Sequence, residues 1–155
     1  MKINLNDCKT SAQAVTKVCY NEDTRNLNFR IECEDLEDLM ECVHIIDGYN
    51  DFDWNTVNAN LKQYAVFKQY YNPENPNNGR DLLKYEIGRE SSPVMYIKYF
   101  KASIRGNKYQ ENGEVREFTQ DIFEKNMRAL GALVKADECD FGNDGCYDYC
   151  RLWWD

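Results

Sequence analysis

The sequence predicts an α+β fold, with a single domain in which an antiparallel sheet of about five strands carries three helices mainly on one face. Three observations support this prediction. The chain has 155 residues, 43% hydrophobic and 14% aromatic, which is enough to bury a core. Apolar side chains alternate at period two in some segments and recur at three- and four-residue spacing in others. Short turns join several expected strands, which favours antiparallel pairing.

The first expected elements are two strands. Residues 12–20 are rich in β-branched side chains and predict a strand, with a short helix as the alternative. Residues 26–33 alternate between apolar and polar side chains, which predicts a strand with one buried face. The polar run 21–25 lies between them, so we expect a hairpin loop there.

Two helices are expected next. In residues 34–46 the apolar side chains share one helical face and the acidic side chains fall on the other. Acids in the first turn also suit the positive end of the helix dipole. Residues 53–71 show similar spacing, although their last third also resembles a strand. The Pro-, Gly- and Asn-rich stretch 72–81 predicts a loop within the domain.

The centre of the chain returns to strand periodicity. We expect strands at 82–88 and 94–106. In the second strand, one alternate set of side chains is largely apolar and is expected to face the core. That set is Val94, Tyr96, Lys98, Phe100, Ala102 and Ile104. Basic and aromatic residues also interleave here, which is typical of single-strand nucleic-acid binding, but a half-buried strand is the simpler interpretation.

The last third contains a turn, a helix and a tail. Asn112 and Gly113 predict a hairpin turn because both residues tolerate a positive φ. Thr119 is the expected N-cap of a helix that continues to about Lys135. Residues 136–155 are acidic and rich in cysteine and aromatic side chains, and we assign them no regular structure.

Charge is divided into blocks along the chain. The net charge is −8, from 19 basic and 27 acidic residues. Residues 31–53 hold nine acids and no Lys or Arg, and residues 136–155 hold six acids and one Arg. Negative charge repels nucleic acids and anionic membranes, so we expect neither as a direct partner. The sequence also shows no signal peptide and no long apolar stretch, so we expect a cytoplasmic protein.

No motif predicts catalysis or a cofactor. The chain lacks the G-x-S-x-G nucleophile elbow and the glycine-rich phosphate loops, and His44 is its only histidine. Seven cysteines at irregular spacings favour reduced thiols over disulfides. Cys139, Cys146 and Cys150 form a weak zinc pattern, because the C-x2-C pair of most structural zinc sites is absent. We therefore predict no metal and no cofactor.

The acidic residues form the candidate binding surface instead. A helix spaces carboxylates by about 5.4 Å per turn, and such a row resembles the charge of a nucleic-acid backbone. Neighbouring exposed aromatic residues would act as anchors, because aromatics are frequent hot spots. The predicted acidic residues are Glu34, Glu37, Asp38, Glu41, Asp47, Asp51 and Asp53. The predicted anchors are Tyr49, Phe52, Trp54, Trp153 and Trp154.

The predicted function is a small acidic, non-catalytic protein-binding module that docks on a basic protein surface, such as that of a nucleic-acid-binding protein. An inhibitor of the kind that phages direct against host defence is one natural form. One alternative is a structural or assembly protein that self-associates through its aromatic tail. The other is a small metal-binding or cysteine-dependent enzyme. A solvated surface that only keeps the chain soluble is the plainest interpretation of the acids.

Overall fold

The computed structural model describes residues 8–46, 51–70, 80–104, 108–111 and 113–155. The α-helices of the described residues are α1 (Ser11–Cys19), α2 (Leu36–Ile46), α3 (Trp54–Tyr64) and α4 (Gln120–Leu133). The main sheet contains β1 (Phe29–Cys33), β2 (Leu83–Glu90), β3 (Ser92–Phe100), β6 (Glu138–Asp144) and β7 (Tyr147–Trp153). A 3-10 helix, η2 (Lys101–Ile104), follows β3, and β4 (Lys108–Glu111) pairs with β5 (Glu114–Glu117) in a separate ribbon.

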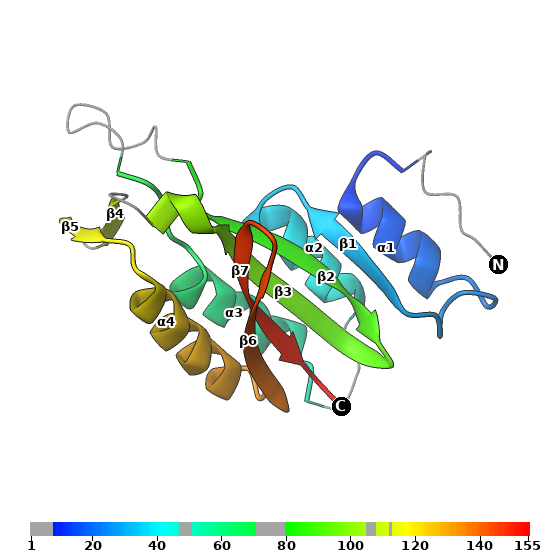
Figure 1. Cartoon of the computed structure of the whole chain (residues 1–155). Coiled ribbons are helices and arrows are strands. Elements are labelled where there is room, and N and C mark those ends of the chain that lie inside the picture. The colour runs from blue at the N-terminus through cyan, green and yellow to red at the C-terminus, as the bar shows by residue number, and fades with distance from the viewer. Residues whose placement is uncertain (1–7, 47–50, 71–79, 105–107, 112) are drawn as a thin grey trace.

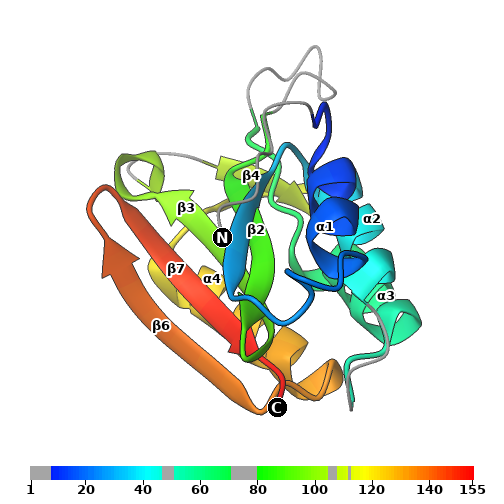
Figure 2. The same cartoon turned by 90° about the vertical axis from the view of Figure 1, so that its right-hand side faces the viewer.

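The architecture is one antiparallel sheet with helices on one face. Its five strands run in the order β1-β2-β3-β7-β6. The helices α1 to α4 lie side by side against that one face (Figures 1 and 2). The predicted α+β class and the five-stranded antiparallel sheet are confirmed, but the described residues form four helices, so the predicted number of three is wrong. In the described part of the chain, no helix is long and apolar enough to cross a membrane.

Helix α1 replaces the strand expected at 12–20. The Thr10 hydroxyl accepts a hydrogen bond from the Gln13 N–H and caps the helix. Ala14, Val15 and Val18 share one face and are buried. Strand propensity is a weak preference, and the burial of this face outweighs it. The helix that we gave as the alternative is therefore correct, and residues 21–25 connect α1 to β1 instead of forming the expected hairpin loop.

Helices α2 and α3 confirm the two helices expected next, although α3 is shorter than predicted. The Asp53 carboxylate accepts a hydrogen bond from the Thr56 N–H at 3.0 Å and caps α3. The helix ends at Tyr64, and the chain then continues in extended form with Phe67 buried in the core. Most of the loop predicted at 72–81 lies outside the described residues.

Strand β3 turns the opposite face to the core from the one predicted. Met95, Ile97 and Tyr99 pack in the core under the helices, whereas Phe100 is exposed. The prediction was wrong because it extended the strand to residue 106. The polar residues beyond Phe100 were then counted on the same face as Met95, which made that face look like the solvent side. Within the real strand, that face is wholly apolar.

The tail forms the β6–β7 hairpin, which the sequence did not lead us to expect. Strand β7 pairs with β3 along its length, from Val94 opposite Trp153 to Phe100 opposite Tyr147. Cys150 and Leu152 point into the core between the sheet and the helices. Asn112 lies outside the described residues, but Glu111 of β4 pairs with Glu114 of β5 and Gly113 has φ 81°, so two strands are joined here as predicted; both lie outside the main sheet.

Candidate functional site

Asp38 is one of the predicted docking residues, but the structure gives it a role within the fold. Its N–H donates to the Asp35 carboxylate at 2.8 Å, and its own carboxylate accepts from the Glu34 N–H at 2.8 Å. This reciprocal pair is a variant of the capping box, and it satisfies backbone donors at the start of α2. The Asp38 carboxylate is therefore engaged by the backbone.

Glu34, Glu37 and Glu41 form the exposed part of the predicted acidic surface. Glu37 and Glu41 lie one turn apart on the side of α2 opposite to the buried Leu39 and Val43. Among the described residues, no Lys or Arg forms an ion pair with any of these three acids. Their charge is therefore not compensated by a paired cation in the described part of the fold.

His44 and Trp54 extend this surface to the start of α3. His44 follows Glu41 on the exposed side of α2, and its ring stacks on that of Trp54 with centroids 4.1 Å apart. The exposed Asp51 and Asp53 precede Trp54 in the chain. Side-chain and backbone hydrogen bonds from Thr56 lower the pKa of Asp53, which keeps it ionised.

We call this set the acidic strip. It consists of Glu34, Glu37, Glu41, His44, Asp51 and Trp54, whereas the carboxylate of Asp53 caps α3 as that of Asp38 serves α2.

The other predicted anchors that the structure describes are Phe52, Trp153 and Trp154, and they are not on this surface. Phe52 and Trp154 are only 2% and 1% exposed, and their rings contact each other edge-to-face at 4.8 Å. Both are core residues, so the expectation that they are exposed anchors is wrong. Trp153 is half-buried on the sheet, where its Nε1–H donates to the Glu90 carbonyl at 2.8 Å. Asp47 and Tyr49 lie outside the described residues.

The acids of the tail are largely paired with cations or hydrogen-bond donors. Arg151 reaches Glu90 and Glu138 at 2.7 Å each and Asp140 at 3.3 Å. Asp148 accepts a hydrogen bond from the Tyr99 hydroxyl at 2.8 Å. Glu138 and Asp140 are therefore ion-paired within the fold.

The two acidic blocks also lie far apart. Helix α2 packs over β1 and β2, whereas β6 is the opposite edge strand of the sheet. Figure 2 shows α2 and β6 on opposite sides of the molecule. The two blocks therefore do not form one continuous face, and the tail does not extend the acidic strip.

The sheet face opposite the helices is a second surface, of which the sequence indicated only the basic and aromatic residues of the segment 94–106. Aromatic side chains and cations alternate over it, with the Arg30 guanidinium 4.3 Å from the Tyr96 ring centroid and Lys98 4.9 Å from that of Tyr147. Glu86 pairs with both cations, at 3.3 and 3.2 Å. The charges on this face thus compensate one another. Its signal in the sequence is the alternation of Tyr147, Tyr149, Arg151 and Trp153 in the tail.

The tail cysteines do not converge on one point. The Cys139 and Cys150 sulfur atoms are 3.8 Å apart, and a hydrogen bond between these thiols lowers the pKa of Cys139. Cys146 is exposed in the turn between β6 and β7. Across the described ranges, no group of three or more His, Cys, Asp or Glu side chains could hold a metal ion.

Comparison with known proteins adds no assignment. No protein-family model matches this chain, and neither a curated protein nor a solved structure matches it.

Proposed function

We propose that this protein is a non-catalytic binding module that docks its acidic strip on a basic surface of another protein. The observation that supports the proposal is the contrast between the two acidic blocks. Arg151 compensates acids of the tail, whereas Glu34, Glu37 and Glu41 form no ion pair among the described residues. Uncompensated charge of one sign on a rigid helix attracts the opposite charge over a long range.

The natural partner class is a nucleic-acid-binding protein, because its basic groove already binds a row of spaced anions. Docking would block that groove, so the module would act as an inhibitor of the kind that phages use against host defence. Association would begin with charge steering and continue with the burial of the Trp54 ring. Trp54 is half-buried and held by His44, so little side-chain freedom is lost when a partner covers it.

Self-association through the aromatic tail, the first alternative, has less support. Leu152 and Trp154 are 1% exposed, so they are not available to a second copy of the folded chain. Strand β7 of the tail is also paired on both sides, with β3 and with β6, so its edges are not open to a second copy.

The test begins with capture of partners from a host lysate at low and high salt, followed by binding kinetics of variants with a captured basic protein. The Glu37→Gln/Glu41→Gln variant should associate roughly tenfold more slowly at low salt, and the difference should shrink as salt screens the charge. Its matched control is Glu114→Gln/Glu117→Gln, which removes two exposed acids from β5.

The control separates the strip from the net charge of the molecule. If both double variants slow association equally, the overall charge matters and the strip does not. Recovery of no basic partner, or a complex indifferent to salt, would contradict the proposal. Trp54→Ala should mainly accelerate dissociation, and its melting temperature shows whether the fold is intact.

A further inference from the structure

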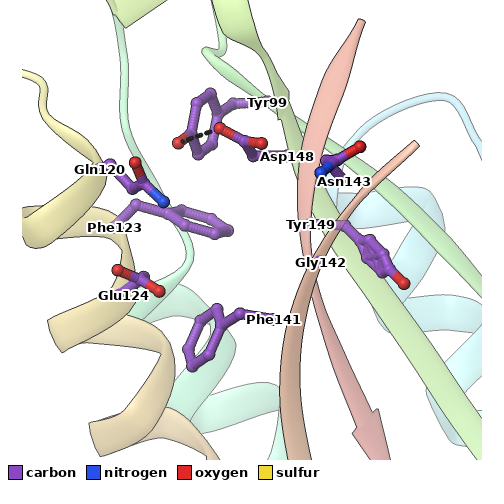
Figure 3. Close-up of a pocket in the computed structure, with 9 residues that line it drawn as sticks. All are labelled: Tyr99, Gln120, Phe123, Glu124, Phe141, Gly142, Asn143, Asp148 and Tyr149. Atoms are coloured by element: carbon purple, nitrogen blue, oxygen red, sulfur yellow. Dashed lines mark hydrogen bonds between the residues drawn. The ribbon is translucent and has the colours of Figure 1, made fainter. Parts of the chain in front are cut away.

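A hollow of about 250 Å³ lies between α4 and the β6–β7 hairpin. By volume it has room for roughly eight water molecules, so it suits a small ligand. Helix α4 contributes Gln120, Phe123 and Glu124, which share one face at i, i+3 and i+4 spacing. Figure 3 shows these side chains facing Phe141 of β6 and Asp148 of β7 across the hollow.

Aromatic rings form part of the lining of the hollow, beside polar side chains such as Gln120 and Asn143. Tyr99 and Phe123 are almost completely buried, and their rings meet edge-to-face at 4.8 Å. Phe141 forms the opposite wall, and the Arg128 guanidinium lies 4.8 Å from its ring centroid. The Phe141 ring thus already attracts a cation of the chain, as expected for an electron-rich ring face, although Arg128 does not itself line the hollow.

Two carboxylates supply the negative charge. The Tyr99 hydroxyl donates to Asp148 Oδ2 at 2.8 Å and fixes that carboxylate at the end of the hollow. Burial and the neighbouring Asp148 carboxylate raise the pKa of Tyr99, so the hydroxyl keeps its proton and continues to donate. Glu124 faces the same space from α4, and its side chain is 21% exposed.

The cations of the chain neutralise these carboxylates only weakly. Lys101 Nζ lies 4.0 Å from Asp148, and Arg128 lies 3.9 Å from Glu124. These distances are at the limit of an ion pair, and the Lys101 and Arg128 side chains are 42% and 64% exposed. Exposed pairs of this kind contribute little, so a better-placed cation can displace them.

We propose that this hollow binds a small organic cation, a protonated amine on a short apolar chain. The ammonium group would lie between Asp148 and Glu124, and the apolar chain would lie against Phe141. An anion would face two carboxylates, and a neutral molecule would leave them without a new partner. This site belongs to α4 and the hairpin, so it does not depend on the acidic strip.

The test is an NMR titration of the full chain with n-butylammonium chloride at constant ionic strength. Backbone amide signals of residues 120–124 and 141–149 should shift and saturate. n-Butanol and sodium butyrate have nearly the same shape without the positive charge, and they should produce no saturating shift at these residues.

Two variants with opposite expected effects make the test specific. Glu124→Gln keeps the shape but removes one charge, and it should weaken binding about tenfold. Arg128→Gln removes the competing internal cation and should tighten binding. The absence of saturation with butylammonium, equal shifts with butanol, or unchanged affinity in Glu124→Gln would overturn the proposal. Because Glu124 is outside the Tyr99–Asp148 hydrogen bond, its variant keeps that contact and should remain folded.

Discussion

Replacing Trp154 by Phe should destabilise the fold far more than the same change at its neighbour Trp153. The Trp154 side chain is 1% exposed, and its Nε1–H donates to the Val134 carbonyl at 2.9 Å. Phenylalanine would leave this buried carbonyl without its donor, which costs about 1–3 kcal/mol. The smaller ring would also leave a space beside Phe52, which adds roughly 1 kcal/mol.

The expected loss for Trp154→Phe is therefore about 3 kcal/mol, a large part of the stability of an ordinary domain. Trp153 also donates to a carbonyl, but it is half-buried on the sheet face without helices, where water can replace the lost donor. Trp153→Phe should therefore cost about 1 kcal/mol or less.

The measurement is urea unfolding of both variants and the parent chain, followed by circular dichroism. The midpoint of Trp154→Phe should fall strongly with an unchanged slope, and its melting temperature should drop by roughly 6–12 °C. Losses for the two variants that agree within about 0.5 kcal/mol would refute the assignment of Trp154 to the core.

Three further predictions follow from local contacts. Asp35→Ala should lower the free energy of unfolding by about 1 kcal/mol because α2 loses its N-terminal cap, and thermal melting would detect it. Gly88→Ala should cost about 3 kcal/mol or more, because the added methyl group collides with the backbone of β1; a melting temperature like that of the parent would contradict this. Burial alone would raise the pKa of Glu90, but hydrogen bonds from Tyr96 and Arg151 outweigh it and lower the pKa below its ordinary value of 4.5. The stability from this contact is thus present above about pH 4.5 and lost as the pH falls through the folded-state pKa. The free energy of unfolding of Arg151→Met should therefore fall less between neutral and acid pH than that of the parent chain.

Local signals in the sequence were sufficient for several elements. The spacing of Leu36, Leu39 and Val43 identified α2, and Thr119 does cap α4, since its hydroxyl accepts a hydrogen bond from the Ile122 N–H. Both signals depend on residues within one or two helical turns of each other. The predicted bounds of α2 and α4 are therefore close to the observed ones.

Long-range pairing was not predictable from the same signals. In the tail, acidic residues fall between the inward Cys139, Phe141 and Cys150, and they conceal the alternation of two strands. Only the pairing of β7 with β3 brings Arg151 within 2.7 Å of Glu90, which is 61 positions earlier. The charge of the tail could not be judged without that contact. The burial of Phe52 against Trp154 depends on tertiary packing in the same way.

The position of β7 between β3 and β6 has a consequence for folding during synthesis on the ribosome. Strand β3 is nearly all buried in the finished fold, yet one of its edges stays open until residues 147–153 have been made. A nascent chain that already contains β1, β2 and β3 therefore exposes one edge of β3, where the backbone N–H and C=O groups are unpaired and the neighbouring side chains are mostly apolar. Translation pauses after residue 100 should favour aggregation, and chaperones that shield such edges should raise the yield.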